Sequence, residues 1–353
     1  MSNMNQVTLK EAARLIATTG SAVTYLLQGE PGVGKSAILA TLAASLPTHH
    51  PVYLEAQTLD LGDVQMPVVD KDTGVHFVPN SAFLPPDPKQ PDQPLIIMLD
   101  EIGKAMRPVQ NALLRLMHER KLGDYSLPTD SIVFATTNLA SDGVGDMIQS
   151  HAKNRVTDVT IKKPDAEEWA IWASANDVDP AVTAWVREYP HCLASYTDPS
   201  QQDNPFIYNP KKQQAAFVSP RSLEKASSIT KHRTSLTPNA LRAALAGTIG
   251  ESAAAQMEAY LTQADALPAW ARVIDTPKDC PVPTEATAQS IMALQAVQRI
   301  TRETASAWFE YMARLHTEVQ ALFVSQAMEG EKAQLLVTNR SFVQWAVTNS
   351  WAY

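Results

Sequence analysis

A phosphate-binding pattern near the N-terminus is the strongest chemical signal in the sequence. Residues 29–36 read Gly-Glu-Pro-Gly-Val-Gly-Lys-Ser, which fits G-x-x-x-x-G-K-[ST] at every fixed position. Glycines in such a loop let backbone N–H groups approach phosphate oxygens. Lys35 is placed to reach the β- and γ-phosphates, and the Ser36 hydroxyl is placed to bind Mg²⁺. The sequence therefore predicts a site for a nucleoside triphosphate with magnesium.

The residues around this loop fit the same interpretation. Residues 23–27 are apolar enough for a buried strand, and residues 37–43 suit a helix whose N-terminus faces the anion. A chance glycine turn is the alternative, but the chain has only 13 glycines in 353 residues. We expect the nucleotide to contact Gly29, Glu30, Pro31, Gly32, Val33, Gly34, Lys35, Ser36, Ala37 and Asp100.

Two carboxylates follow an apolar run further along the chain. Asp100 and Glu101 come directly after residues 95–99, Leu-Ile-Ile-Met-Leu. At the carboxyl end of a strand, Asp100 can bind magnesium with Ser36, and Glu101 can orient and deprotonate an attacking water. A simple helix cap is the alternative for such a pair. The phosphate loop upstream favours catalysis.

Asn138 ends a further predicted strand, residues 132–137. A polar side chain there could touch the γ-phosphate or the attacking water if this strand lies beside the acidic one. An asparagine that starts a turn is the common alternative. The catalytic interpretation of Asn138 therefore depends on the whole order of motifs.

The first 160 residues or so alternate strand-like and helix-like segments, which is typical of a parallel sheet covered by helices. Residues 8–18 form an amphipathic pattern, and a helix is expected from Pro108 onward. The proline-rich segment 60–94 has an Asp-Thr-Gly turn between two strand-like runs, which indicates a projecting hairpin. Residues 123–128 suggest a turn or a smaller hairpin.

After Pro164 the pattern becomes helical. Asp165 is a helix cap, and Pro220 and Pro238 each suit a first helical position. Residues 196–214 are polar and predict an exposed loop. Residues 285–328 contain neither proline nor glycine, which predicts one long helix or a helical hairpin. The aromatic tail, residues 342–353, could pack on its own core or bind a partner.

Composition excludes several classes of protein. The formal net charge of −8 disfavours a surface that grips nucleic acid non-specifically. Cys192 and Cys280 have no metal-ligand spacing, so we expect two reduced thiols in a cytoplasmic protein. No run approaches 18 apolar residues, and residues 1–10 lack an apolar signal core, so no membrane contact is expected.

Taken together, the order of these motifs resembles the AAA+ ATPases, and within them the MoxR-like group. Three features suggest that group: the insertion 60–94, the sequence Asp-Glu-Ile-Gly-Lys-Ala at 100–105, and Ser-Pro-Arg-Ser at 219–222. The resemblance covers roughly residues 7 to 250. The remaining C-terminal residues, about one hundred, match nothing that we can use.

The resemblance implies roles for three further residues. Asn138 would be the sensor-1 residue, and Arg221 the sensor-2 arginine that reaches the γ-phosphate from a helical lid. Arg155 would be the arginine finger, which acts on the nucleotide of a neighbouring subunit. Many relatives have Asp-Arg-Phe at the finger, whereas this chain has Asn-Arg-Val. A surface or ion-paired side chain is the alternative for each arginine.

The expected fold is therefore α/β: an AAA+ P-loop core with a parallel sheet, then an all-helical lid and a helical C-terminal region. The expected domains are 1–163 with the insertion 60–94, 164–250 with an insertion near 196–214, and 251–353. The resemblance implies an ATPase that uses ATP and Mg²⁺ as a homo-oligomeric ring, a hexamer. It also implies a protein client, with a von Willebrand factor A-domain protein as one candidate partner.

Two other functions stay open from the sequence. A nucleic-acid remodelling motor or helicase loader is disfavoured by the acidic balance and by the absence of a basic stripe. A nucleotide-gated interaction module with negligible turnover is the other. ATP is favoured over GTP because no guanine-reading Asn-Lys-x-Asp sequence occurs.

Overall fold

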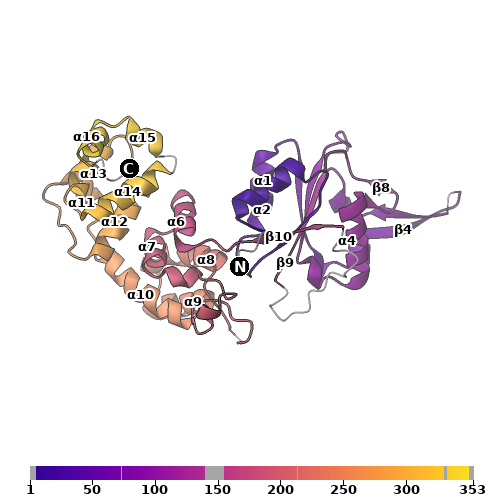
Figure 1. The fold of residues 1–353 in the computed structure, drawn as a ribbon, viewed down its shortest axis with the longest axis horizontal. Helices are drawn as coiled ribbons and strands as arrows, with labels where there is room; N and C mark the ends of the chain where they lie inside the picture. Colours follow the sequence, from indigo (N-terminus) through magenta and orange to yellow (C-terminus); the bar gives the residue numbers. More distant parts are fainter. Residues whose placement is uncertain (1–4, 73, 140–154, 213, 330–331, 350–353) are drawn as a thin grey trace. The chain divides into compact units, whose positions relative to one another are not determined.

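The computed structural model describes residues 5–72, 74–139, 155–212, 214–329 and 332–349. The chain divides into two compact units, Met1–Lys163 and Pro164–Tyr353. The first is an α/β unit and the second is helical (Figure 1). Among the residues described, no helix is both long enough and apolar enough to cross a membrane.

A parallel six-stranded sheet forms the centre of the α/β unit. Its strands in spatial order are β1 (Gln6–Val7), β10 (Thr157–Ile161), β2 (Tyr25–Gln28), β9 (Ile132–Thr137), β6 (Leu95–Asp100) and β3 (His50–Glu55). Every residue of β6 and β9 is buried, as expected for strands covered on both faces. The predicted parallel sheet is confirmed. Because the strands are parallel, their carboxyl ends meet at one edge of the sheet.

The two faces of the sheet are covered by different helices (Figure 1). On one face, α1 (Leu9–Thr19) and α2 (Ala37–Ser45) pack on side chains such as Ile96 and Met98. On the other, α4 (Arg107–Glu119) packs on the alternate residues of the same strand, Ile97 and Leu99. The period-two alternation of a strand therefore divides one apolar run between two cores.

Two hairpins extend from the α/β unit. In the larger one, β4 (Gln65–Asp70) pairs antiparallel with β5 (Gly74–Pro79), after a short helix α3 (Leu61–Val64). Figure 1 shows this ribbon reaching away from the sheet. The smaller one joins β7 (Lys121–Leu122) to β8 (Tyr125–Ser126). Both hairpins were predicted from their turn residues.

The smaller hairpin packs against the base of the larger one. Gly123, in its turn, has a φ of +57°, and a Cβ atom there would lie 2.4 Å from the backbone oxygen of Phe77. His76 Nδ1 also lies 3.6 Å from Asp124 Oδ2. Only glycine permits both this backbone conformation and this close approach.

The helical unit begins with a bundle around Trp169 and Trp185, both fully buried. Its helices are α6 (Ala166–Ala175), α7 (Pro180–Glu188), α8 (Pro220–Thr230), α9 (Pro238–Ile249) and α10 (Glu251–Asp265). The predicted helix starts at Asp165, Pro220 and Pro238 are confirmed. The loop 196–214 is not simply exposed, because Phe206 within it is buried in this core and Ile207 is buried as well.

A second core lies in the C-terminal half of the helical unit. Its helices are α11 (Trp270–Asp275), α12 (Ala286–Arg299), α13 (Ala305–Met312), α14 (Thr317–Met328), α15 (Ala333–Val337) and α16 (Arg340–Thr348). The prediction of one long helix or a hairpin over 285–328 is wrong, since three helices occupy that range. At the first break, the Thr304 hydroxyl accepts a hydrogen bond from the Thr301 amide at 2.9 Å, which competes with helical pairing.

The aromatic tail packs on this core. Phe342 and Trp345 are buried, and the Trp345 indole donates a hydrogen bond to Gln320 at 2.7 Å. Packing of the tail on its own core is therefore confirmed for these two residues. Trp351 and Tyr353 lie outside the described residues. The predicted division of the helical unit at residue 250 stays a prediction.

Candidate active site

The phosphate loop connects β2 to α2. Gly32 and Gly34 have φ values of +73° and +103°, which side chains other than glycine rarely adopt. The Lys35 ammonium is buried and donates three hydrogen bonds: to the Gly29 carbonyl at 2.8 Å, to the Glu30 carbonyl at 3.2 Å and to Asn138 Oδ1 at 3.1 Å. The loop therefore holds its lysine at the carboxyl end of the sheet.

Asp100, the last residue of β6, collects hydroxyl groups around its carboxylate. Oδ2 accepts hydrogen bonds from Ser36 Oγ at 3.2 Å and from the Tyr53 hydroxyl at 2.8 Å. Oδ1 accepts one from the Thr136 hydroxyl. Carboxylate and hydroxyl oxygens are ligands that Mg²⁺ prefers, and Mg²⁺ commonly uses one or two carboxylates plus phosphate oxygens. The adjacent oxygens of Asp100 and Ser36 therefore fit a magnesium ion.

No larger metal site competes with this one among the described residues. In that part of the chain, no group of three or more His, Cys, Asp or Glu side chains is placed to bind a metal ion. A metal at Asp100 and Ser36 would therefore need further ligands from a bound nucleotide and from water.

Glu101 turns away from the strand into the site. Its φ of +55° lies in the left-handed region, which costs a non-glycine residue on the order of 1–2 kcal/mol. Both carboxylate oxygens accept hydrogen bonds from Asn138 Nδ2, at 3.1 and 3.2 Å, and Lys104 Nζ lies 2.7 Å from Oε2. Two neighbours therefore fix the orientation of this carboxylate.

The structure brings five predicted residues together at one edge of the sheet. They come from the ends of two adjacent strands, β6 and β9, and from the loop after β2: Lys35, Ser36, Asp100, Glu101 and Asn138. Their catalytic roles stay predictions.

Three partners in the site were not singled out from the sequence: Tyr53, Thr136 and Lys104. Thr136 lies two residues before Asn138 on β9, so the period of a strand could have indicated it. Lys104 follows Glu101 by three residues. Tyr53 comes from β3, 47 residues before Asp100, and no local pattern connects the two.

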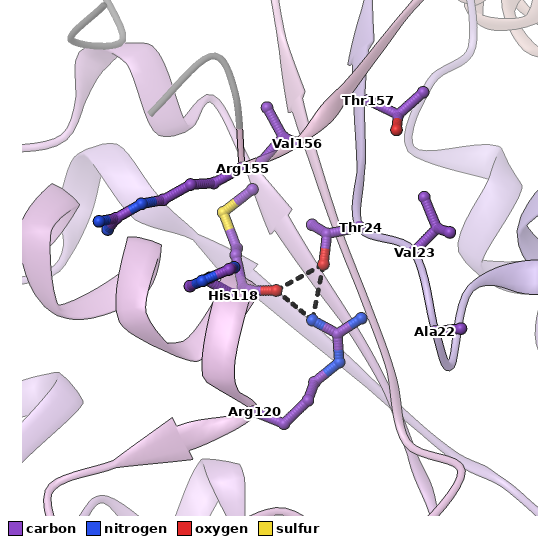
Figure 2. Close-up of a pocket in the computed structure, with 9 residues that line it drawn as sticks. Ala22, Val23, Thr24, His118, Arg120, Arg155, Val156 and Thr157 are labelled. Carbon is purple, nitrogen blue, oxygen red and sulfur yellow. Dashed lines mark hydrogen bonds between the residues drawn. The ribbon is translucent and has the colours of Figure 1, made fainter. Parts of the chain in front are cut away.

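Arg155 does not join this group. It precedes β10, whose first residue, Thr157, pairs with Tyr25, the first residue of β2. The phosphate loop follows the other end of β2, roughly 13 Å away at about 3.3 Å per residue. Arg155 is exposed there and lines a small cavity (Figure 2). Most of the stretch before it, residues 140–154, lies outside the described residues.

The fourth predicted catalytic residue, Arg221, belongs to the helical unit. It lies in the first turn of α8, after Ser219, whose hydroxyl caps that helix. Its predicted contact with the γ-phosphate stays a prediction.

A buried ion pair connects the phosphate loop to the end of the α/β unit. Glu30, inside the loop, lies 3.6 Å from Lys163, and both side chains are less than a tenth exposed. Breaking a buried ion pair by removing one partner typically costs about 3–5 kcal/mol. The loop conformation and the last residue of the unit are therefore energetically coupled.

Comparison with known proteins gave one family match. Residues 24–141, about a third of the chain, match the family model of the AAA domain (dynein-related subfamily). This range contains the phosphate loop, the acidic pair and Asn138. No curated protein matches the chain.

Several solved structures are similar to the chain at low sequence identity. NtrX from Brucella abortus in complex with ADP is 14% identical, over 98% of this chain and 68% of that one, with a TM-score of 0.41. RuvB from Thermotoga maritima, a point mutant, is 14% identical over 94% and 93%, also with 0.41. A candidate ATPase from Cytophaga hutchinsonii is 15% identical over 72% and 88%, with 0.33.

Proposed function

We propose that the chain is a MoxR-type remodelling ATPase that works as a hexameric ring on a protein client, and the match of residues 24–141 to the AAA domain model supports this proposal. The observation that carries the proposal is the hydrogen-bonded group of Lys35, Asn138 and Glu101, beside which Asp100 accepts a hydrogen bond from Ser36. Each of these residue types has a part in phosphoryl transfer to water.

The proposed chemistry follows from what each side chain can do. Lys35 and the loop amides hold the β- and γ-phosphates. Mg²⁺, bound by Asp100 and Ser36, would neutralise charge on the phosphate oxygens. Glu101 accepts the proton of the attacking water, and Lys104 and Asn138 keep its carboxylate oriented. Asn138 bridges Lys35 and Glu101, so it is placed to respond to the γ-phosphate.

Ring assembly is supported by the position of Arg155. It lies at the edge of the sheet opposite its own phosphate loop, so it is remote from the nucleotide of its own chain. Head-to-tail contact between copies would place this edge against the site of the next copy, and such contacts close into rings. In the same proposal, Arg221 contacts the γ-phosphate from the helical unit.

A protein client is supported by the hairpin β4–β5. Met66, Val69 and Val75 are each more than half exposed, and Phe77 is 42% exposed. Large exposed apolar side chains gathered on one element mark contact sites for other proteins. A von Willebrand factor A-domain protein remains one candidate partner in this proposal. We also propose a cytoplasmic location, because Cys192 and Cys280 are free thiols.

Two substitutions separate nucleotide binding from hydrolysis. Lys35→Ala should abolish ATP binding, because the phosphates lose their cation. Glu101→Gln should bind ATP but hydrolyse it about 10²–10⁴-fold more slowly, since general base catalysis contributes about that much. Binding is measured with a fluorescent ATP analogue and turnover by phosphate release. Glu119→Gln, an exposed change on α4, is the matched control.

These variants test two assignments: Glu101 as the general base and a protein as the client. Normal turnover by Glu101→Gln would refute Glu101 as the base. The same variant, held in ATP, should trap the client in an affinity pull-down from cells. Recovery of nucleic acid alone, with ATPase activity that nucleic acid stimulates and salt suppresses, would replace the protein client with a nucleic-acid substrate.

A further inference from the structure

Arg120 lies at the same edge of the sheet as Arg155 (Figure 2). It follows the last residue of α4, with a φ of +57°. Its guanidinium donates hydrogen bonds to Thr24 Oγ1 at 2.6 Å, to the Gly20 carbonyl at 3.1 Å and to the Met117 carbonyl. One side chain therefore joins the end of α1, the start of β2 and the end of α4.

This junction continues to the strand that follows Arg155. The Thr24 hydroxyl donates to the Met117 carbonyl, and the Thr24 carbonyl accepts a hydrogen bond from the Thr157 amide at 2.8 Å. Thr157 is two residues after Arg155. The position of the Arg155 backbone is thus connected to Arg120 through Thr24 by two consecutive hydrogen bonds.

The cavity beside this junction has a volume of about 190 Å³ and is lined by two arginines and a histidine. Arg120, Arg155 and His118 line it, and its other lining residues include no carboxylate. In Figure 2 the side chains of Arg155 and His118 lie along one side, while Arg120 points toward Thr24. Among the described residues that line the cavity, none is a carboxylate that could pair with the Arg155 guanidinium.

An arginine at position 120 lowers the stability of the fold. It is partly buried, burial lowers its pKa, and its Nε–H has no hydrogen-bond partner among the described residues. Among those residues no carboxylate forms an ion pair with it. A buried cation without a counter-charge destabilises a fold, and the left-handed backbone adds to that cost. Stability alone does not account for an arginine here.

We propose that Arg120 is a positioning residue for Arg155: it fixes the start of β10 through Thr24, so that Arg155 meets the γ-phosphate bound to the neighbouring copy. This inference rests on the proposed function. Arg120 does not touch the nucleotide; it acts on hydrolysis in the next subunit by holding the strand start that carries Arg155.

The test uses mixed rings of two defective full-length chains. Lys35→Ala cannot bind its own nucleotide but keeps both arginines. Arg120→Ala keeps its own phosphate loop but presents Arg155 poorly. Alone, Arg120→Ala should bind ATP within about twofold of wild type and hydrolyse it about 10–100-fold more slowly, since misplacement by about 1 Å costs that much. Arg115→Ala, exposed on α4, is the matched arginine control and should keep full activity.

Mixing the two chains at equal amounts should restore hydrolysis. In a randomly mixed ring about a quarter of the interfaces pair an intact phosphate loop with an intact arginine donor, so activity should reach about a quarter of the wild-type value. Ring formation is checked by mass photometry. If Arg120 affected hydrolysis only in its own chain, mixing Arg120→Ala with Lys35→Ala would not restore hydrolysis.

A mixture of Arg155→Ala with Lys35→Ala tests the trans-acting role of Arg155 separately from the positioning role of Arg120. If this pair regains activity and the Arg120→Ala pair does not, the positioning role is refuted and the trans-acting finger stands. If neither pair regains activity in assembled rings, the finger itself is refuted, and the inference with it.

A second variant tests the same connection in case Arg120→Ala does not fold. Thr24→Val keeps the shape of the side chain but removes the hydroxyl that links Arg120 to β2. It should show the same slow hydrolysis, unchanged ATP affinity and rescue by mixing. Wild-type turnover in Thr24→Val would overturn the proposed connection.

Discussion

The hydroxyl of Tyr53 provides a quantitative test of the candidate magnesium site. Tyr53 donates a hydrogen bond of 2.8 Å to Oδ2 of Asp100, the same oxygen that Ser36 contacts at 3.2 Å. Tyr53→Phe removes this donor and leaves the ring in place. A group that orients a metal-binding carboxylate contributes to metal affinity although it does not touch the metal.

The size of the effect follows from exposure. A hydrogen bond to a charged group contributes about 1.5–3 kcal/mol when it is shielded from water. Tyr53 is 50% exposed, so water replaces part of the lost bond. We take about 1 kcal/mol, which corresponds to about a fivefold change in affinity.

The assay is calorimetric titration of ADP with and without Mg²⁺. The ratio of the two dissociation constants measures the coupling between metal and nucleotide. Tyr53→Phe should reduce this ratio about fivefold and leave the Mg²⁺-free affinity for ADP unchanged. Tyr125→Phe is the matched control, because the Tyr125 hydroxyl is buried without a hydrogen-bond partner in the described structure.

Three results would refute the reasoning. An unchanged ratio in Tyr53→Phe would show that Asp100 does not need this donor to hold the metal. An equal loss of ADP affinity with and without Mg²⁺ would show that Tyr53 acts on the nucleotide and not on the metal. A shift in Tyr125→Phe as large as that in Tyr53→Phe would trace the effect to the loss of any tyrosine hydroxyl.

Three further changes test the packing around the site and in the helical unit. Gly123→Ala should destabilise the α/β unit by at least about 1–2 kcal/mol and speed proteolysis of β4–β5, because its Cβ would overlap Phe77; unchanged cleavage would refute the contact. Trp345→Phe should cost about 1–3 kcal/mol in denaturant unfolding by leaving buried Gln320 without its donor; no loss would contradict packing of the tail. Burial raises the pKa of Tyr311 to about 12, above about 10 in the unfolded chain, so stability should fall as pH rises from 10 to 12, and Tyr311→Phe should flatten that fall in a pH series of melts.

The phosphate loop, the acidic pair and Asn138 could be predicted because each is a local pattern. A strand followed by a polar residue places that residue at the carboxyl edge of a parallel sheet, whichever strands are neighbours. Tyr53 could not be found this way. Its contact with Asp100 depends on β3 lying beside β6 in a particular register, with Tyr53 opposite Met98, and neither is encoded within a short window.

The misjudged helix over 285–328 has a related cause. Proline and glycine are the strong local signals for a helix end, and this range has neither. One break is set by the pair Thr301 and Thr304. The other is stabilised from outside, since the His316 amide donates to the side chain of Gln289, 27 residues away, at 2.7 Å. A helix end that depends on such a tertiary contact has no local sequence pattern that could predict it.

The three hydrogen bonds of Lys35 have a consequence for ligand selection. An ammonium group has three protons, and the protein's own oxygens already accept all three. A phosphate oxygen that approaches the ammonium therefore competes with these protein oxygens for its protons. Its advantage over the displaced carbonyl and amide oxygens is charge, which strengthens each bond. Such a competition disfavours weakly charged anions, and we expect a nucleotide that displaces Asn138 Oδ1 to leave Asn138 bonded only to Glu101 within this group.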